Sequence, residues 1–250
     1  MKSSNHPPRI ARRDFVKSCV GVMALGLQSR ARSGELDTMK RYTPSRLVDA
    51  RTRRFRVADL DPGETYLFHY PYVTTPCFLI NLGRPVNPGR PLQTEAGERY
   101  QWPGGVGPEN TIVAFSAICA HKMTHPAKSV SFINYRPETV TYKNSNDRRA
   151  EGRDLIYCCS ENSVYDARDG ARVLGGPASQ PLTAIGLEYD ESDDTLSAAG
   201  TFGGEMYEQF FARFGDRLQL EYETDDVDAE AGDATVVQHI DEFTKSRVLC

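Results

Sequence analysis

Apolar residues are spread along the chain in many short runs that have the length of β-strands. Residues 54–57 alternate polar and apolar side chains, and residues 77–82 form a continuous apolar run of the kind found in buried strands. Turn-forming Pro, Gly and Asp residues separate the runs. The pattern therefore predicts a mostly β protein. The other expected strands lie at residues 65–70, 111–118, 130–133, 139–142, 155–157, 187–189 and 195–198.

One later segment has helical spacing instead. Four aromatic residues between positions 206 and 214 fall on one face of a helix, and we expect that face to pack on the β structure. Residues 221–233 then hold seven acidic residues and no basic one. Such a stretch is typical of a solvated, partly disordered linker. The alternative is a docking strip for a basic partner protein, because complementary charge speeds encounter.

Composition and charge narrow the class of protein. The chain has 250 residues, 39% of them hydrophobic, which is enough for one substantial domain or two small ones. The net charge of −4 gives no support to a nucleic-acid-binding protein. Residues 1–33 hold seven basic residues and one acidic residue, a net of +6, which leaves −10 for the remainder. The body of the protein is therefore acidic.

The basic N-terminal segment has the pattern of an export signal. The pair Arg12-Arg13 precedes a short, mildly apolar run at residues 18–27, which is the order found in a twin-arginine (Tat) signal. The run is too short for the roughly 20 residues that span a bilayer, and residues 31–33 fit a cleavage site. We therefore expect residues 1–33 to be a Tat signal and the mature protein to be periplasmic. An uncleaved leader would hold it at the membrane, and the alternative to a signal is a basic amphipathic helix.

Two stretches about forty residues apart carry side chains that bind metals. Cys119 and His121 follow directly on one expected strand, and Cys158 and Cys159 follow on another, with Glu161 close behind. Each stretch places soft thiolates beside hard or borderline ligands on what is expected to be a tight loop. A strand end also provides a rigid platform for a ligand. The two stretches therefore read as the two halves of one metal site.

The remaining cysteines lie away from other ligand types. Cys19 belongs to the expected leader, and Cys77 sits in an apolar run, where a buried free thiol is the expectation. Nothing around Cys250 suggests a role, and the adjacent Cys158 and Cys159 are not an evident pair. The pattern is therefore not that of a disulfide scaffold.

The two stretches together resemble the ligand pattern of Rieske iron–sulfur proteins. In that family Cys-x-His is followed by Cys-x-x-His, so that two thiolates hold one iron and two imidazoles hold the other. The segment Ser163-Val164-Tyr165-Asp166 is similar to the family's Ser-x-Tyr-Asp, and residues 176–182 are similar to its proline loop. The resemblance implies an all-β fold, a Rieske-type antiparallel β-sandwich or barrel with a smaller cluster-binding subdomain.

The resemblance covers roughly residues 40–200 and implies a division of the chain. The Rieske domain would occupy residues 34–204, with its cluster-binding subdomain at about 115–182. Residues 205–250 would form a helical and acidic extension.

The ligand set implied by the resemblance departs from the family at one position. Cys119 and Cys158 take the thiolate positions, and His121 takes that of the first imidazole. Glu161 stands where the second imidazole belongs. Three interpretations remain open. Glu161 binds iron through oxygen, which would lower the potential; Cys159 binds iron after a one-residue shift of the loop; or the domain holds no cluster.

The same alignment assigns several neighbouring positions. Thr124 and Ser160 occupy the places of a loop-to-loop disulfide that many family members have, so that bond is absent here. Ser163 and Tyr165 resemble the family's hydroxyl donors to cluster sulfur and thiolate, which raise the potential. His125 is a further ligand candidate, but a surface or core histidine is the preferred interpretation.

Three further pieces, residues 70–83, 104–108 and 112–119, resemble the small Rieske subunits of arsenite oxidases. That resemblance implies an exported [2Fe-2S] electron-transfer subunit with a larger, molybdenum-containing catalytic partner and a periplasmic cytochrome as electron acceptor. No nucleophile–base pair is evident, so we expect no catalysis by this chain alone. The alternatives are the Rieske subunit of a quinol:cytochrome c oxidoreductase and a cluster-free structural or assembly protein.

Overall fold

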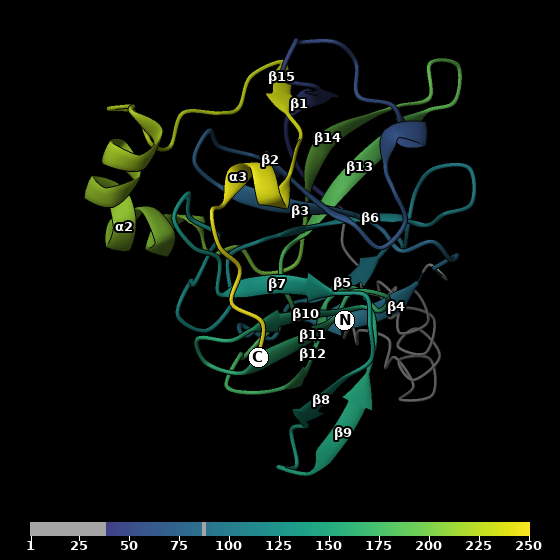
Figure 1. Cartoon of the computed structure of the whole chain (residues 1–250), viewed down its shortest axis with the longest axis vertical. Helices are drawn as coiled ribbons and strands as arrows, with labels where there is room; N and C mark the ends of the chain where they lie inside the picture. The colour runs from purple at the N-terminus through teal and green to yellow at the C-terminus, as the bar shows by residue number, and fades with distance from the viewer. Residues whose placement is uncertain (1–38, 87–88) are drawn as a thin grey trace, which may run out of the picture. The chain divides into compact units, whose positions relative to one another are not determined.

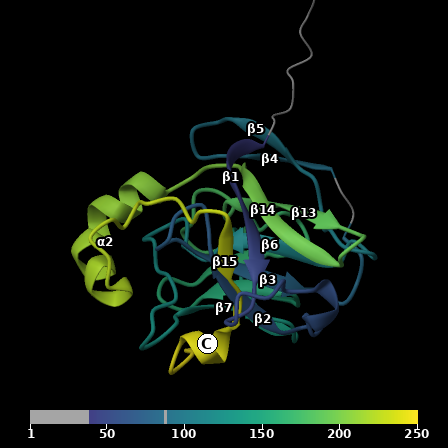
Figure 2. The same cartoon turned by 90° about the horizontal axis from the view of Figure 1, so that it is seen from above.

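The computed structural model describes residues 39–86 and 89–250, and the expected Tat signal at residues 1–33 lies outside this part of the chain. Eight strands form the principal sheet: β1 (Lys40–Val48), β2 (Thr65–His69), β3 (Pro76–Asn81), β6 (Ile112–Ser116), β13 (Ala184–Asp190), β14 (Thr195–Phe202), β15 (Ala234–Val236) and β16 (Gln238–His239). Their order in the sheet is β15-β1-β14-β13-β6-β3-β2-β16 (Figures 1 and 2). Neighbouring strands are antiparallel except β1 and β15.

A second, four-stranded sheet has the order β12-β11-β10-β7 and contains one of the two candidate ligand stretches. Its strands are β7 (Ile133–Arg136), β10 (Leu155–Cys158), β11 (Ser163–Asp166) and β12 (Arg172–Gly175). Two hairpins and a short 3₁₀ helix complete the β part: β4 (Arg90–Gln93) with β5 (Arg99–Trp102), β8 (Val140–Lys143) with β9 (Arg149–Gly152), and η1 (Val57–Asp59). The predicted all-β fold is confirmed.

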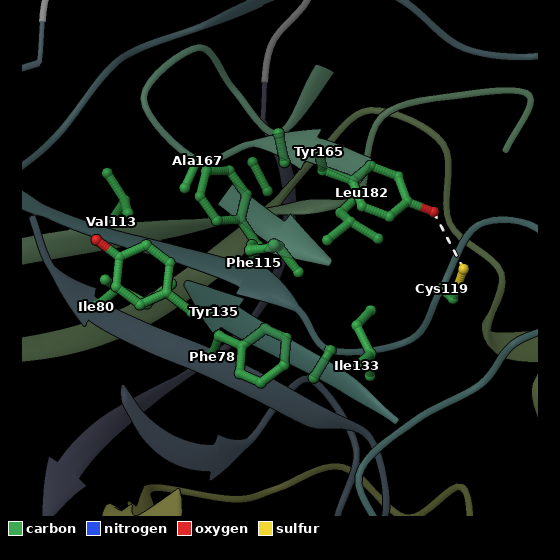
Figure 3. Close-up of a cluster of buried hydrophobic side chains, with 14 of the residues drawn as sticks. Phe78, Ile80, Val113, Phe115, Cys119, Ile133, Tyr135, Tyr165, Ala167 and Leu182 are labelled. Atoms are coloured by element: carbon green, nitrogen blue, oxygen red, sulfur yellow. Dashed lines mark hydrogen bonds between the residues drawn. The ribbon is translucent and has the colours of Figure 1, made fainter. Parts of the chain in front are cut away.

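Strand β3 shows how the apolar pattern builds the core. Phe78 and Ile80 belong to a core that includes side chains of the small sheet, whereas Cys77 and Leu79 belong to a second core. Successive side chains of a strand point to opposite faces, so a strand buried on both faces needs a continuous apolar run. Figure 3 shows the first core, to which both sheets contribute. Cys77 is the buried free thiol that its surroundings predicted.

The predicted helix is present and extends further than expected. It spans Tyr207–Tyr222 (α2), and its aromatic face packs against residues just after β6. A short second helix, α3 (Ile240–Phe243), follows β16. Within the described residues, no helix has the length and hydrophobicity needed to cross a membrane.

The segment at residues 205–250 is built into the same unit as the rest of the body, since it supplies β15 and β16 to the large sheet. The linker expected at residues 221–233 is also packed down. Ala231 N–H donates to Pro71 O (2.9 Å), and Val73 N–H donates to Ala229 O (2.9 Å). The expectation of a partly disordered linker was wrong, because the acidic side chains can face water while the backbone pairs with residues 71–73.

Candidate metal centre

The first candidate stretch forms a tight loop, residues 119–125, shortly after β6. The loop, called the first loop below, is closed by Cys119 N–H donating to Thr124 O (2.8 Å) and Met123 N–H donating to Cys119 O (2.9 Å). Met123 has a positive φ of 58°, which lets the chain reverse direction within a few residues. The loop thereby holds Cys119 at a fixed place near the end of a buried strand.

The second stretch is the turn between β10 and β11, residues 159–162, called the second loop below. Strand pairing places Cys158 opposite Ser163, so the turn has four residues. Asn162 takes a positive φ of 60°, a conformation that asparagine tolerates better than most residues. Cys159 N–H also donates to Phe132 O (2.7 Å). The second loop is thus anchored both to its own hairpin and to the residue before β7.

The two loops bring Cys119 and Cys158 together as buried, free thiols. The neighbouring Cys158 thiol is the main cause that lowers the pKa of Cys119 to about 6, and Cys119 in turn raises the pKa of Cys158 above its usual value. The two thiols therefore titrate as a pair, one after the other. Two thiols that lie close together in this way are a suitable pair of ligands for one iron.

Several donors surround this thiol pair. Ala120 N–H donates to the Tyr165 hydroxyl oxygen (3.1 Å), which leaves the phenol hydrogen free for the Cys119 sulfur 3.2 Å away (Figure 3). The His121 N–H also points to the Cys119 sulfur, and it and the Tyr165 bond contribute to the lowered pKa of Cys119. The site is therefore prepared for negative charge on sulfur before any metal binds.

The second sulfur has its own donors. The backbone N–H groups of Ser160 and Glu161 point to the Cys158 sulfur and oppose the rise of its pKa. The Ser163 hydroxyl faces Cys119 and helps to lower its pKa, although its oxygen does not reach the geometry of a hydrogen bond. Ser163 and Tyr165, predicted as donors to the site, both lie beside Cys119.

An imidazole and a carboxylate lie at the outer side of the site. His121 Nδ1 is buried without a hydrogen-bond partner and lies 3.9 Å from Glu161 Oε2. A buried nitrogen without a partner is costly, so it marks a place where a partner is expected. The two side chains are 29% and 25% exposed. The two loops thus place two possible metal-ligand atoms, a nitrogen of His121 and an oxygen of Glu161, opposite each other.

Sequence reasoning missed Lys122. Its ammonium lies 2.9 Å from Glu161 Oε1, and this hydrogen bond is the largest cause that lowers the pKa of the Glu161 carboxyl. Glu161 is therefore ionised and held across the two loops without a metal. The sequence offered one clue, since Lys122 directly follows His121, but its partner became evident only when the loops met.

Cys159 does not join the site. Its sulfur forms a disulfide with Cys250, with the Cα atoms 5.7 Å apart. A sulfur in a disulfide has no thiolate to offer to iron. The interpretation in which Cys159 replaces the missing imidazole therefore disagrees with this arrangement. The expectation that Cys250 has no role was also wrong, because 91 residues separate the two cysteines and no local pattern announces the pair.

His125 is a core histidine, as preferred from the sequence. Its Nδ1 lies 2.9 Å from Met123 O, and its ring packs edge-on against Phe210 and Phe214 at centroid distances of 4.8 and 5.0 Å. Burial lowers the pKa of His125, so the ring is neutral at neutral pH. His125 links the first loop to helix α2.

The proline loop approaches the second loop closely. Gly176 has a φ of +79°, and a Cβ there would lie 2.2 Å from Asn162 O. Only glycine fits such an approach without movement of the backbone. The start of the proline loop, at Gly176, therefore lies directly against the second loop.

The four candidate ligands form two pairs and not one group. Among the residues described here, no group of three or more His, Cys, Asp or Glu side chains is placed to hold one metal ion. A Rieske-type cluster instead needs two ligands on each of two irons. The Cys119–Cys158 pair and the facing His121 and Glu161 supply two such pairs, one of them with oxygen in place of the usual second nitrogen.

Tyr165→Phe is expected to lower the free energy of unfolding by about 1–3 kcal/mol, because it leaves the buried Ala120 N–H without an acceptor. Urea denaturation measures this change. Tyr70→Phe is the matched control, since the Tyr70 hydroxyl is equally buried but has no hydrogen-bond partner. Equal effects of the two substitutions would contradict the role given to the Tyr165 hydroxyl.

The chain was compared with known protein families and solved structures. No protein-family model matches the sequence. The chain is similar to the soluble domain of the Rieske protein II (soxF) from Sulfolobus acidocaldarius, with 24% sequence identity and a TM-score of 0.43. The similarity covers 64% of this chain and 78% of that chain. At this level of similarity the site rests on the contacts described above.

Proposed function

We propose that this protein is a Rieske-type electron-transfer protein that holds a [2Fe-2S] cluster with an unusual ligand set. Cys119 and Cys158 would bind one iron, and His121 and Glu161 would bind the other. The observation that carries the proposal is the buried pair of free thiols in one core, brought together by two separate loops and close enough to shift each other's pKa. Such a cluster, when bound, accepts and releases single electrons.

The residues around the thiols would control how easily the site takes up negative charge. Tyr165 lies within hydrogen-bond distance of the Cys119 sulfur, and the backbone N–H groups of His121, Ser160 and Glu161 act to lower the pKa of the two thiols. Such interactions favour the more negative state. Glu161 acts in the opposite direction, because a carboxylate adds a negative charge that a neutral imidazole lacks. Lys122 offsets part of that charge through its ion pair with Glu161. We expect a potential below that of a site with two imidazoles.

The partly exposed side of the site supports a role in transfer between proteins. Cys119 and Cys158 are fully buried, whereas His121 and Glu161 reach the surface. A partner that approaches this side would meet the two residues that would hold the second iron. We propose a larger catalytic subunit, of the molybdenum type implied by the resemblance to arsenite oxidases, as the electron donor, and a periplasmic cytochrome as the acceptor.

Export is part of the proposal. The Arg12-Arg13 pattern and the short apolar run that follows support a Tat signal at residues 1–33 and a periplasmic location. Tat export suits a protein that receives its cofactor before it crosses the membrane.

The test is anaerobic reconstitution with iron and sulfide, followed by EPR spectroscopy of the reduced protein. We expect a rhombic signal with coupling to one nitrogen. Glu161→His should introduce a second nitrogen coupling and raise the midpoint potential, because an imidazole replaces an anionic ligand. Glu208→His, which replaces an exposed glutamate on α2, is the control and should leave both unchanged.

Two results would contradict the proposal. Two nitrogen couplings in the unmodified protein would show that a second histidine, not Glu161, binds iron. Failure to retain iron after careful reconstitution would favour the cluster-free alternative. One contact already supports that alternative: the ion pair with Lys122 gives the Glu161 carboxylate a partner without metal.

A further inference from the structure

Residues 244–250, called the strap below, lie along the segment that precedes and begins β7. Figure 1 shows the strap, in yellow, running from α3 past one end of β7. A series of hydrogen bonds joins it to residues 128–134. They link Lys245 N–H to Lys128 O (3.0 Å), Ser131 N–H to Ser246 O (2.9 Å), Val248 N–H to Ser131 O (2.9 Å) and Asn134 Nδ2 to Val248 O (3.0 Å).

The strap ends at the second loop. Cys250 is bonded covalently to Cys159, and Arg136 donates a further hydrogen bond to Cys250 O (3.0 Å). Cys159 is itself the first residue of the second loop, next to Cys158 and two residues before Glu161. Its N–H is held by Phe132 O, and Phe132 lies between Ser131 and Asn134, which both pair with the strap. One side of the second loop is therefore fastened twice, once through the backbone and once through sulfur.

The first loop is held by different means. Ile118 and Met123 pack on α2 together with Phe210 and Leu218, and the ring of His125 lies against two aromatic rings of the same helix. No covalent bond joins the first loop to the second, since Thr124 and Ser160 carry no thiol. The Lys122–Glu161 ion pair joins the two loops directly, but each loop is attached to the rest of the protein separately, the first by α2 and the second by the strap.

We infer that the Cys159–Cys250 disulfide and the strap position the second loop for ligand binding. Cys159 and Cys250 are positioning residues, because they act on Cys158 and Glu161 through the loop and do not touch iron themselves. The inference deepens the proposed electron-transfer function and rests on it for the identity of the ligands, but the restraint on the loop is a property of the chain alone. Pre-organised ligands bind a metal more tightly than ligands that must be ordered first.

The expected effect is local. A four-residue turn such as the second loop opens by small fluctuations unless it is tied down, and local openings occur with free energies well below that of global unfolding. Cutting the disulfide should therefore raise the opening frequency of residues 159–162 far more than that of β2 and β3. We expect amide hydrogen exchange at Cys159 and Glu161 to become at least about tenfold faster.

Hydrogen exchange on the metal-free, oxidised protein tests the inference directly. The variants are Cys159→Ser, Cys250→Ser and the double substitution. Each single change breaks the same bond, so all three should show the same acceleration in the second loop. Cys77→Ala, which removes a buried thiol from the other core, is the matched control and should leave the second loop unchanged. If a serine variant does not fold, reduction of the unmodified protein by a phosphine supplies the open form.

Two outcomes would overturn the inference. Unchanged exchange in residues 159–162 would show that the hairpin alone fixes the loop. An equal acceleration throughout the large sheet would show that the disulfide stabilises the whole fold without a particular effect on the ligands.

A second measurement connects the restraint to the site. In the iron-loaded protein, loss of iron to a chelator should be at least about tenfold faster in the double variant than in the unmodified protein. Iron loss at an unchanged rate, with a loop that exchanges faster, would overturn the positioning role while leaving the proposed function intact. A protein that takes up no iron would refute the proposed function, and hydrogen exchange would still decide whether the strap holds the loop.

Discussion

Cys158→Ser is expected to reduce the iron content of the reconstituted protein from about two atoms per chain to nearly none. Cys158 and Cys119 are the only cysteines that the described structure leaves free beside each other, and no other thiol lies ready to replace either one. A serine hydroxyl is a hard ligand and is not deprotonated at neutral pH, so it binds this iron far more weakly than a thiolate. Iron and sulfide analysis after reconstitution, with the visible spectrum, measures the loss.

The control separates ligand loss from thiol loss. Cys77→Ala removes a thiol that is as fully buried as that of Cys158 but donates to Tyr70 O (3.0 Å) in the other core. It should lower stability by about 1 kcal/mol through the lost hydrogen bond and leave the iron content unchanged. Retention of iron in Cys158→Ser would show that the thiol pair is not the cluster site.

Phe210→Ala is expected to destabilise the protein by about 3–5 kcal/mol, the usual cost of removing a fully buried phenylalanine. Phe210 is completely buried on the inner face of α2, and its ring packs edge-on against His125 in the first loop. The substitution leaves a cavity between the helix and the loop and removes the aromatic contact. Urea denaturation, followed by circular dichroism, measures the change in the free energy of unfolding.

Leu220→Ala on the same helix is the matched control, because the Leu220 side chain is 83% exposed and its loss should change stability by less than about 0.5 kcal/mol. In addition, Phe210→Ala should loosen the first loop, where His125 would lose one of its two aromatic neighbours, and should leave the second loop, which the strap holds, unchanged. An effect of Phe210→Ala as small as that of Leu220→Ala would show that the packing of α2 on the rest of the protein contributes little to the free energy of unfolding.

The sequence determined the elements because their signals are local. The continuous apolar run that became β3 required a strand buried on both faces, and the aromatic spacing that became the start of α2 required a helix with one buried face. The positions of Cys119, His121 and Cys158 after strands were readable in the same way. Helix α2 was predicted too short, since its second half carries charged residues and Gly215, which weaken the pattern without ending the helix.

Only the tertiary structure decided which side chains meet. The sequence left Cys159 and Glu161 as rival ligands, and the fold separates them: Cys159 is bonded to a residue 91 positions away, while Glu161 faces His121 and Lys122. The chain's last segment, expected to be an extension, instead adds strands to the large sheet and fastens the second loop. Local sequence carries periodicity and turn chemistry, whereas such pairings depend on the path of the whole chain, which brings distant segments together only after the core has formed.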